Sequence, residues 1–227
     1  MTQANDIVIV SGVRTAIGTF NGSLKHTHQH DLGAAVIREA IARAGIAPQD
    51  IDETIVGNVG QIAESGFIAR ICQLRAGIPQ ESTAYSVNRQ CGSGLQALAD
   101  GMMQLQSGQA EVVVACGAEI MGFGPSPATR RLMDRLNIDV QSIDLIELNE
   151  AFAAQALAVM NDLRLDPARV NVNGGAIALG HPVGASGAIL PVKLMYEMAR
   201  SGARTGLVTM CIGGGQGISM LFEREGA

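Results

Sequence analysis

Apolar and polar positions alternate along the chain in a way that predicts strands and helices in turn. Short apolar runs, such as those at 7–11 and 83–87, are typical of strands. Longer stretches repeat apolar residues every three or four positions and so predict helices, and Gly45 is placed to end the first of them. An alternation of this kind favours an α/β protein with mainly parallel sheets covered by helices.

The pattern breaks near Met121 and then resumes. We predict helices at 31–44 (with Asp31 as the cap), 67–75, 92–106, 129–136, 150–163 and 184–200. The predicted strands are residues 7–11, 53–56, 83–87, 111–115, 143–148, 170–173, 206–210 and 218–223.

Two of the predicted helices begin with similar segments. Cys91-Gly-Ser-Gly-Leu95 opens one and Gly184-Ala-Ser-Gly-Ala188 opens the other, and a strand ending in cysteine follows each helix. Short runs of small residues can match by chance, but the same order of helix and strand afterwards favours two related halves. We place these halves at residues 1–121 and 122–227.

Composition excludes several classes of protein. Hydrophobic residues make up 47% of the chain and charged residues 16%, as expected for a folded globular protein. A net charge of −5 gives no reason to expect a nucleic-acid partner, although a helix N-terminus could still attract an anionic ligand. Since neither a signal peptide nor an apolar run of membrane-spanning length is evident, we expect a cytoplasmic protein with no membrane partner.

The cysteines and histidines predict neither a disulfide framework nor a metal site. The four cysteines are widely spaced and include no CxxC pair, and we interpret Cys72 and Cys116 as small buried residues. His26, His28 and His30 alternate in a polar stretch, but no fourth ligand is evident.

Cys91 is a candidate nucleophile because it lies between a predicted strand and a predicted helix. The N–H groups and dipole of a helix N-terminus favour the thiolate form of cysteine. The alternative is a buried structural cysteine, and from this residue alone the two interpretations are equally good.

Three further residues are candidates, each with a structural alternative. His181 follows a glycine-rich stretch that, with Pro182, would present the imidazole, and a structural histidine is the alternative. Asn149 stands where a strand turns into a helix, and on spacing alone a helix cap is the commoner role. Cys211 precedes Gly213-Gly-Gly215, which could bind phosphate or simply turn the chain. A second cysteine at a second strand end adds weight, since one thiolate can attack a thioester while another group moves a proton at carbon.

Together these segments resemble the thiolase family along nearly the whole chain. The opening stretch Ile9–Gly18 is similar to the first strand and following loop of the family. The four catalytic motifs of the family, in order, resemble Asn88-Arg-Gln-Cys-Gly-Ser-Gly-Leu95, Asn149-Glu-Ala-Phe152, Gly180-His-Pro182 and Cys211-Ile-Gly-Gly-Gly215.

The resemblance implies a role for each candidate. Cys91 would accept the acyl group, and His181 would activate its thiol. His181 would also hold the thioester oxygen of the second substrate, in an oxyanion hole where Asn149 positions a water. Cys211 would remove or return the α-proton. The backbone N–H groups of Cys91 and Gly213 would form a second oxyanion hole.

This chain is shorter than family members. The stretch ending at Met121 resembles the end of the fourth strand of the first half, and Gly122 onward resembles the first helix of the second half. The family has its loop domain and two strands between those points. We therefore expect a thiolase-like fold of two related βαβαβ halves, each short of one strand, without the loop domain that supplies much of the CoA-binding surface.

The implied activity is acyl transfer in fatty acid metabolism. It would be thiolytic cleavage of 3-ketoacyl-CoA or Claisen condensation of two acyl-CoA molecules through an acyl-cysteine. CoA thioesters would be substrates of a homodimer with no permanently bound cofactor. One alternative is a weakly active or non-catalytic deletion form. Another is a decarboxylating condensing enzyme of the ketoacyl-synthase type, against which Cys211 argues, because decarboxylation generates a carbanion without a thiol base.

Overall fold

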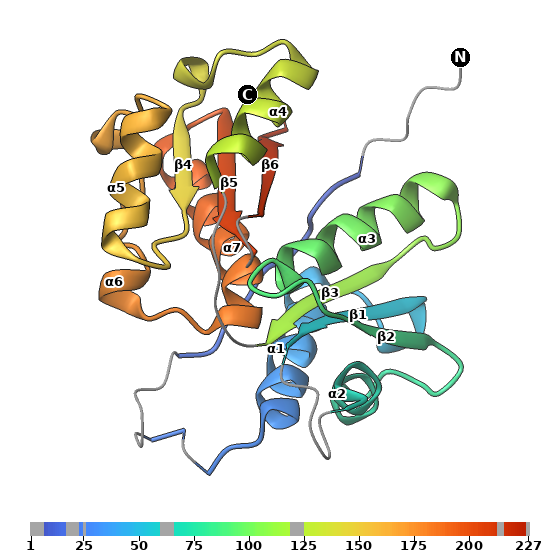
Figure 1. The fold of residues 1–227 in the computed structure, drawn as a ribbon. Helices are drawn as coiled ribbons and strands as arrows, with labels where there is room; N and C mark the ends of the chain where they lie inside the picture. Colours follow the sequence, from blue (N-terminus) through green and yellow to red (C-terminus); the bar gives the residue numbers. More distant parts are fainter. Residues whose placement is uncertain are drawn as a thin grey trace.

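The computed structural model describes residues 7–16, 23–24, 26–59, 66–118, 125–212 and 216–225. Within these ranges strands and helices alternate and form two three-stranded sheets (Figure 1). The predicted α/β class with mainly parallel sheets is confirmed. The junction at 121/122, where we place the boundary between halves, lies outside the described residues.

The N-terminal sheet has the order β2-β1-β3, and all three strands are parallel. Its strands are β1 (Glu53–Asn58), β2 (Thr83–Val87) and β3 (Val113–Ala118). Three helices cover it: α1 (Gln29–Ala44), α2 (Ile68–Ala76) and α3 (Ser93–Ser107), and the 3₁₀ turn Pro48–Asp50 precedes β1.

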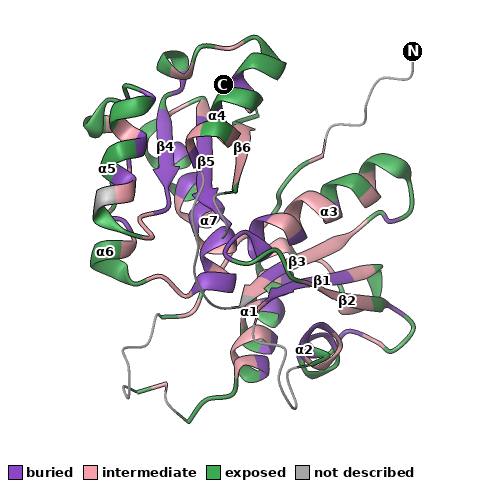
Figure 2. Cartoon of the chain, viewed as in Figure 1, coloured by how far each residue is buried: buried purple, intermediate pink, exposed green. Residues whose placement is uncertain are grey.

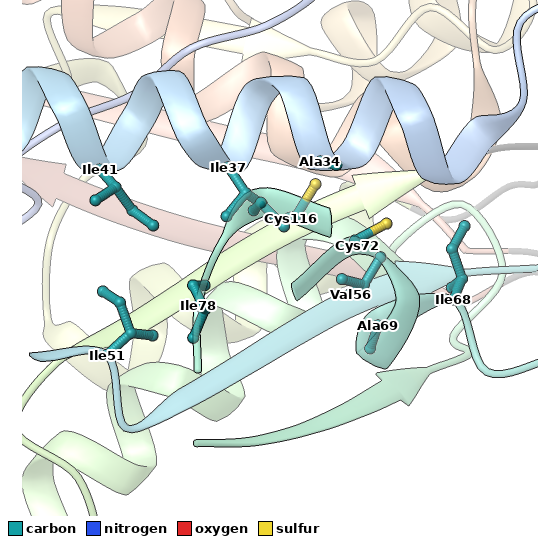
Figure 3. Packing of buried hydrophobic residues seen from close by; sticks show 11 residues of the cluster. Ala34, Ile37, Ile41, Ile51, Val56, Ile68, Ala69, Cys72, Ile78 and Cys116 are labelled. Carbon is teal, nitrogen blue, oxygen red and sulfur yellow. The ribbon is translucent and has the colours of Figure 1, made fainter. Parts of the chain in front are cut away.

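Alternate residues of β1 face different helices. Val56 packs in a buried cluster with Ile37 of α1 and Cys72 of α2 (Figure 3). The neighbouring residue Ile55 lies on the side of α3, where it approaches Gly101. Because successive side chains of a strand point to opposite faces, helices bury both faces of this sheet.

The C-terminal sheet has the order β4-β5-β6, with β4 and β5 parallel and β6 antiparallel to β5. Its strands are β4 (Leu145–Leu148), β5 (Thr205–Cys211) and β6 (Gly217–Glu223). Along β5, Leu207 packs in the cluster that includes α5, whereas Val208 and Met210 pack with α7. The helices here are α4 (Pro125–Leu136), α5 (Ala153–Asp162), α6 (Ala176–Leu179) and α7 (Val183–Ser201), with 3₁₀ turns at Val140–Ser142 and Pro167–Arg169.

The predicted strand at 7–11 is wrong, since the structure assigns no strand to residues 7–16. Both sides of β1 are already occupied, because it pairs directly with β2 and β3. The segment is instead tied to α7, where Tyr196 donates a hydrogen bond to the carbonyl of Gly12 at 3.2 Å. Val8, Ile9 and Val10 are left 56%, 44% and 62% exposed.

The predicted strand at 170–173 is reduced to one bridge between Ile146 and Val170. The left-handed backbone of Asn171, with φ of 49°, ends the extended conformation. The Asn171 side chain continues the pairing: its Oδ1 accepts from the Leu148 N–H at 2.9 Å and its Nδ2 donates to the Leu148 carbonyl at 2.8 Å. A side-chain amide thus replaces the next backbone pair.

The predicted cap of the first helix is also wrong. Helix α1 begins at Gln29 with His28 in the N-cap position. Asp31 lies in the first turn of α1 and forms an ion pair with Arg75 of α2. Its carboxylate therefore joins two helices instead of capping one.

Helices α3 and α7 touch backbone to backbone through two glycines. A Cβ built on Gly94 of α3 would lie 2.7 Å from the backbone nitrogen of Ala188, and one on Gly187 of α7 would lie 2.6 Å from that of Leu95. Gly94 and Gly187 occupy equivalent positions in the two similar segments, so the contact is reciprocal. Neither helix could approach as closely with a side chain at these positions.

Buried and exposed residues follow this arrangement (Figure 2). Strands β4 and β5 and the first turns of α3 and α7 are buried, while the outer faces of the covering helices are exposed. In the described part of the chain, no helix is both long and apolar enough to cross a membrane.

We predict that Gly94→Ala destabilises the protein by about 3 kcal/mol, because the new methyl group would meet backbone atoms that no rotamer change can move. Gly108→Ala is the matched control at the C-terminal end of α3, where nothing lies within 4 Å and only the positive φ is strained. Its cost should be about 1 kcal/mol. Urea unfolding measures both variants, and equal losses would contradict the role given to Gly94.

Candidate active site

Cys91 is held in a tight turn between β2 and α3. Gln90 has a φ of 48°, a left-handed conformation that is strained for a non-glycine residue. The Ser93 hydroxyl fixes the turn by accepting from the Arg89 N–H at 2.9 Å and donating to the Gln90 carbonyl at 2.5 Å. Cys91 therefore stands just before the first turn of α3, fully buried.

Cys211 ends β5 and is likewise fully buried. Its thiol is in hydrogen-bond contact with the Cys91 thiol. The two segments approach closely because Gly92 has no side chain: a Cβ there would lie 2.2 Å from Cγ2 of Ile212. The two cysteines singled out in the sequence are thus brought together from different sheets.

The environment of Cys91 favours the neutral thiol. The hydrogen bond with Cys211 raises the pKa of Cys91, and burial raises it further. Backbone hydrogen bonding at the turn lowers the pKa, but by less. The expected thiolate is therefore not the form of the resting protein, and Cys91 needs a base to become nucleophilic.

His181 lies between two polar side chains. Its Nε2 is 3.1 Å from Nδ2 of Asn149, and its Nδ1 is 2.5 Å from Oγ of Ser186. Ser186 donates its own proton to the carbonyl of Pro182 at 3.0 Å, so Nδ1–H of the histidine is the donor to Oγ. This network assigns the unprotonated nitrogen to Nε2, which accepts from Asn149.

Burial lowers the pKa of His181 to about 4. The imidazole is therefore neutral at pH 7 and keeps a lone pair for a proton. Because the free thiol and the free imidazole are both neutral, a proton would pass between them only when another charge compensates it.

Asn149 is not a helix cap, so the structural alternative for this residue is wrong. It follows β4, and its backbone N–H donates to the carbonyl of Thr209 at 3.0 Å. Phe152 occupies the N-cap position of α5. The Asn149 side chain is 1% exposed, and its Oδ1 has no hydrogen-bond partner in the part of the chain described here. A buried acceptor in this state is rare, and it keeps an unused capacity to accept a hydrogen bond.

Two charged residues hold the loop before His181. Glu150 accepts from the Ile177 N–H at 3.0 Å and from Nδ2 of Asn171 at 3.1 Å. Gly175 must be glycine for this, since a Cβ there would lie 2.1 Å from the Glu150 carboxyl carbon. Lys193 donates to the Gly174 carbonyl at 2.6 Å.

Lys193 also forms a buried ion pair with Glu147, with Nζ and Oε2 2.7 Å apart. Burial raises the pKa of Glu147 to about 7, although Lys193 opposes the shift. Ser186 and Lys193 lie seven residues apart on α7 and so share one face. Neither residue was selected from the sequence, yet a single lysine among apolar helix positions was a usable signal.

The other singled-out residues have different settings. Cys72 and Cys116 belong to the apolar cluster under α1, and burial raises the pKa of their thiols to about 12 and about 11 (Figure 3). The rings of His28 and His30 stack at 5.0 Å. Gly213, predicted for an oxyanion hole, lies outside the described residues.

Comparison with known proteins matches this chain to one family. The profile "Thiolase, C-terminal domain" covers residues 103–224. The acetyl-CoA acetyltransferase of Rhizobium meliloti is 30% identical, with 96% of this chain and 98% of the relative covered. That of Shinella zoogloeoides is 28% identical, with 95% and 98% covered. The beta-ketothiolase BktB of Cupriavidus necator is also 28% identical, with 98% and 100% covered.

The fold is shared with the crystal structure of the Bacillus anthracis acetyl-CoA acetyltransferase. The TM-score is 0.90 at 24% identity, with 95% of this chain and 98% of that chain covered.

The alignments also show an internal gap. The one with the Shinella zoogloeoides relative extends over 385 positions, and since this chain has only 227 residues, at least 158 of them face a gap. This chain therefore spans nearly the full length of that relative while lacking an internal stretch.

We predict that His181 makes the protein less stable in mild acid. Its pKa in the folded state, about 4, lies below the ordinary 6.5, so the unfolded chain binds the proton more readily. Stability is unaffected above pH 6.5 and falls by up to about 3 kcal/mol as the pH drops through this interval. Urea unfolding of the wild type and His181→Gln at pH 7 and pH 4.5 isolates this contribution. Parallel losses in the two proteins would contradict it.

Proposed function

The chain belongs to the thiolase family, and on that premise we propose that it transfers acyl groups between CoA thioesters. The reaction would be Claisen condensation of two acyl-CoA molecules or, in reverse, thiolytic cleavage of 3-ketoacyl-CoA. The observation that carries the proposal is the contact between the buried thiols of Cys91 and Cys211. The neutral imidazole of His181, which contacts the Asn149 side chain, supplies the base that the proposal needs.

In the first half-reaction, Cys91 attacks the thioester carbonyl. Its thiol proton passes to Nε2 of His181, a carbon–sulfur bond forms to Cys91, and the bond to the CoA sulfur breaks. The leaving CoA thiolate takes up the proton. The high pKa of Cys91 confines thiolate formation to the time when the substrate is bound.

In the second half-reaction, the Cys211 thiol first passes its proton to Nε2 of His181, and the resulting thiolate acts as base. It removes a proton from the α-carbon of a second acyl-CoA, and the carbanion attacks the acyl group on Cys91. A carbon–carbon bond forms, and the bond between Cys91 and the acyl carbon breaks. The released Cys91 thiolate takes back the proton held by His181, and both cysteines are thiols again.

Oxyanion stabilisation falls to two sites with two donors each in this proposal. His181 and a water on Asn149 hold the enolate oxygen of the second substrate, and Oδ1 of Asn149 has no other hydrogen-bond partner among the described residues. The N–H groups of Cys91 and Gly213 hold the oxygen of the acyl-enzyme intermediate. The substrates are CoA thioesters, no resident cofactor or metal takes part, and a homodimer is the proposed assembly.

The two thiols come from the two proposed halves, residues 1–121 and 122–227. Their contact also argues against a decarboxylating condensing enzyme, because decarboxylation generates the carbanion and a second thiol is not needed as a base. The weakly active deletion form remains compatible with this proposal. The internal gap would remove part of the CoA-binding surface, but it leaves the four proposed reacting side chains in the chain.

We expect labelled acetyl-CoA to acylate Cys91. Peptide mapping should place the label there in the wild type and in Cys211→Ala, and should find none in Cys91→Ala. Cys211→Ala should form the acyl-enzyme but not 3-ketoacyl product, because only the second half-reaction needs its thiol. Cys116→Ala is the control for removing a buried thiol elsewhere. If Cys211→Ala lost both half-reactions equally, Cys211 would not act only as the α-proton base, and the roles proposed for the two cysteines would be wrong.

We also predict that binding of the CoA moiety contributes less to kcat/KM in this protein than in a full-length relative. Binding energy from the remote part of a substrate positions its reactive end, and the missing stretch should remove part of that binding. We compare kcat/KM for acetyl-CoA with kcat/KM for the acetyl thioester of N-acetylcysteamine, which lacks the nucleotide. The ratio of these two values should be smaller for this protein than for the full-length Shinella zoogloeoides relative. An equal preference in both enzymes would show that this chain grips CoA without the missing stretch.

A further inference from the structure

A cavity of about 400 Å³ lies between the N-terminal sheet and α7, and none of the four proposed catalytic side chains lines it. Its walls are mainly aliphatic. Val36 and Ala40 come from α1, Val114 from β3, and Val192 and Met195 from α7. Residues 11–16 of the unpaired N-terminal segment line it as well. This volume falls within the range of about 300–1,000 Å³ typical of small-molecule sites.

The cavity is not uniformly apolar. Ser11 and Gln29 both line it, and the Ser11 Oγ and Gln29 Oε1 atoms are buried with no hydrogen-bond partner within the described ranges. Such atoms are rare in folded proteins and indicate a missing partner. Arg14, an exposed cation, lines the same cavity and bonds only to the neighbouring Thr15 carbonyl among the contacts described.

The pocket is partly open, so in the free protein solvent lies against its aliphatic walls. Water makes none of the dispersion contacts that an apolar ligand would make there, and leaving apolar surface in water is unfavourable. A linear aliphatic chain would restore those contacts. A carboxylate head would be attracted to Arg14 and could accept a hydrogen bond from the Ser11 hydroxyl, whereas the amide oxygen of Gln29 takes only a donor.

We propose that this cavity binds a medium-chain aliphatic molecule with an anionic or polar head, such as a fatty carboxylate. The site depends on the cavity alone and not on the proposed catalytic function. The same chemistry occurs in a free carboxylate and in the acyl chain of a CoA thioester, and the two sources can be separated by experiment.

Isothermal titration calorimetry with octanoate tests the site directly. We expect saturable binding with one site per chain. Ala40→Leu, which fills the cavity from α1, should weaken binding about tenfold or more. Ala42→Leu is the matched control, since Ala42 is exposed on the same helix, and it should bind as the wild type does. Thermal unfolding verifies that both variants are folded.

The head group is tested with a surface variant that does not touch the core. Arg14→Gln should weaken octanoate binding several-fold and leave 1-octanol binding unchanged, because only octanoate carries the charge. S-octyl-CoA, a thioether that cannot acylate Cys91, distinguishes the source. If Ala40→Leu weakens its binding too, the acyl chain of a thioester is the ligand. If S-octyl-CoA does not bind while octanoate does, the ligand is the free amphiphile.

The proposal is overturned if octanoate shows no saturable binding, or if Ala40→Leu and Ala42→Leu bind it equally. It is also overturned if amide hydrogen exchange shows residues 7–11 strongly protected in the ligand-free protein. In that case the N-terminal segment itself occupies the space beside β3.

Discussion

The backbone contact between α3 and α7 is the constraint on which the rest of the structure depends. Gly94 and Gly187 each lie against the backbone nitrogen of the residue that follows the other glycine, at Ala188 and Leu95. The first turns of the two helices are therefore fixed relative to each other by atoms that have no rotamers. Since Cys91 immediately precedes one of these turns and His181 the other, the same contact sets where the nucleophile and the imidazole lie.

Around this contact lie buried groups that rest uncharged. The pKa of Cys91 is raised by the Cys211 thiol and by burial, and burial lowers the pKa of His181. An ion pair of thiolate and imidazolium is thus avoided until a substrate supplies the compensating charge. Charges are used instead in the supporting structure, where Lys193 and Glu150 hold the loop that leads to His181.

The shortened chain shows which parts of such a protein are separable. At least 158 positions of the alignment with the Shinella zoogloeoides relative face a gap, yet Cys91 remains in contact with Cys211, and His181 remains in contact with Asn149. The consequences appear away from the site. The apolar segment at 8–10 is exposed, and an aliphatic cavity opens beside β3. Gly94 and Ala188 of the helix contact line this cavity, whereas none of the four proposed catalytic side chains does.

The sequence alone determined the alternation of strand and helix and the order of the motifs, and it predicted the residues that we propose to react, because periodicity and local residue chemistry depend on neighbouring positions. It did not determine the fate of residues 7–11 or 170–173. Residues 7–11 form no strand because β1 and β3 pair directly with each other. Residues 170–173 form only one bridge because the Asn171 side chain replaces the next backbone pair. The charge states of Cys91 and His181, and the parts played by Ser186, Lys193 and Glu150, were also decided by tertiary structure. These charge states and contacts depend on burial and on residues that are distant in sequence, and neither can be predicted from a local sequence pattern.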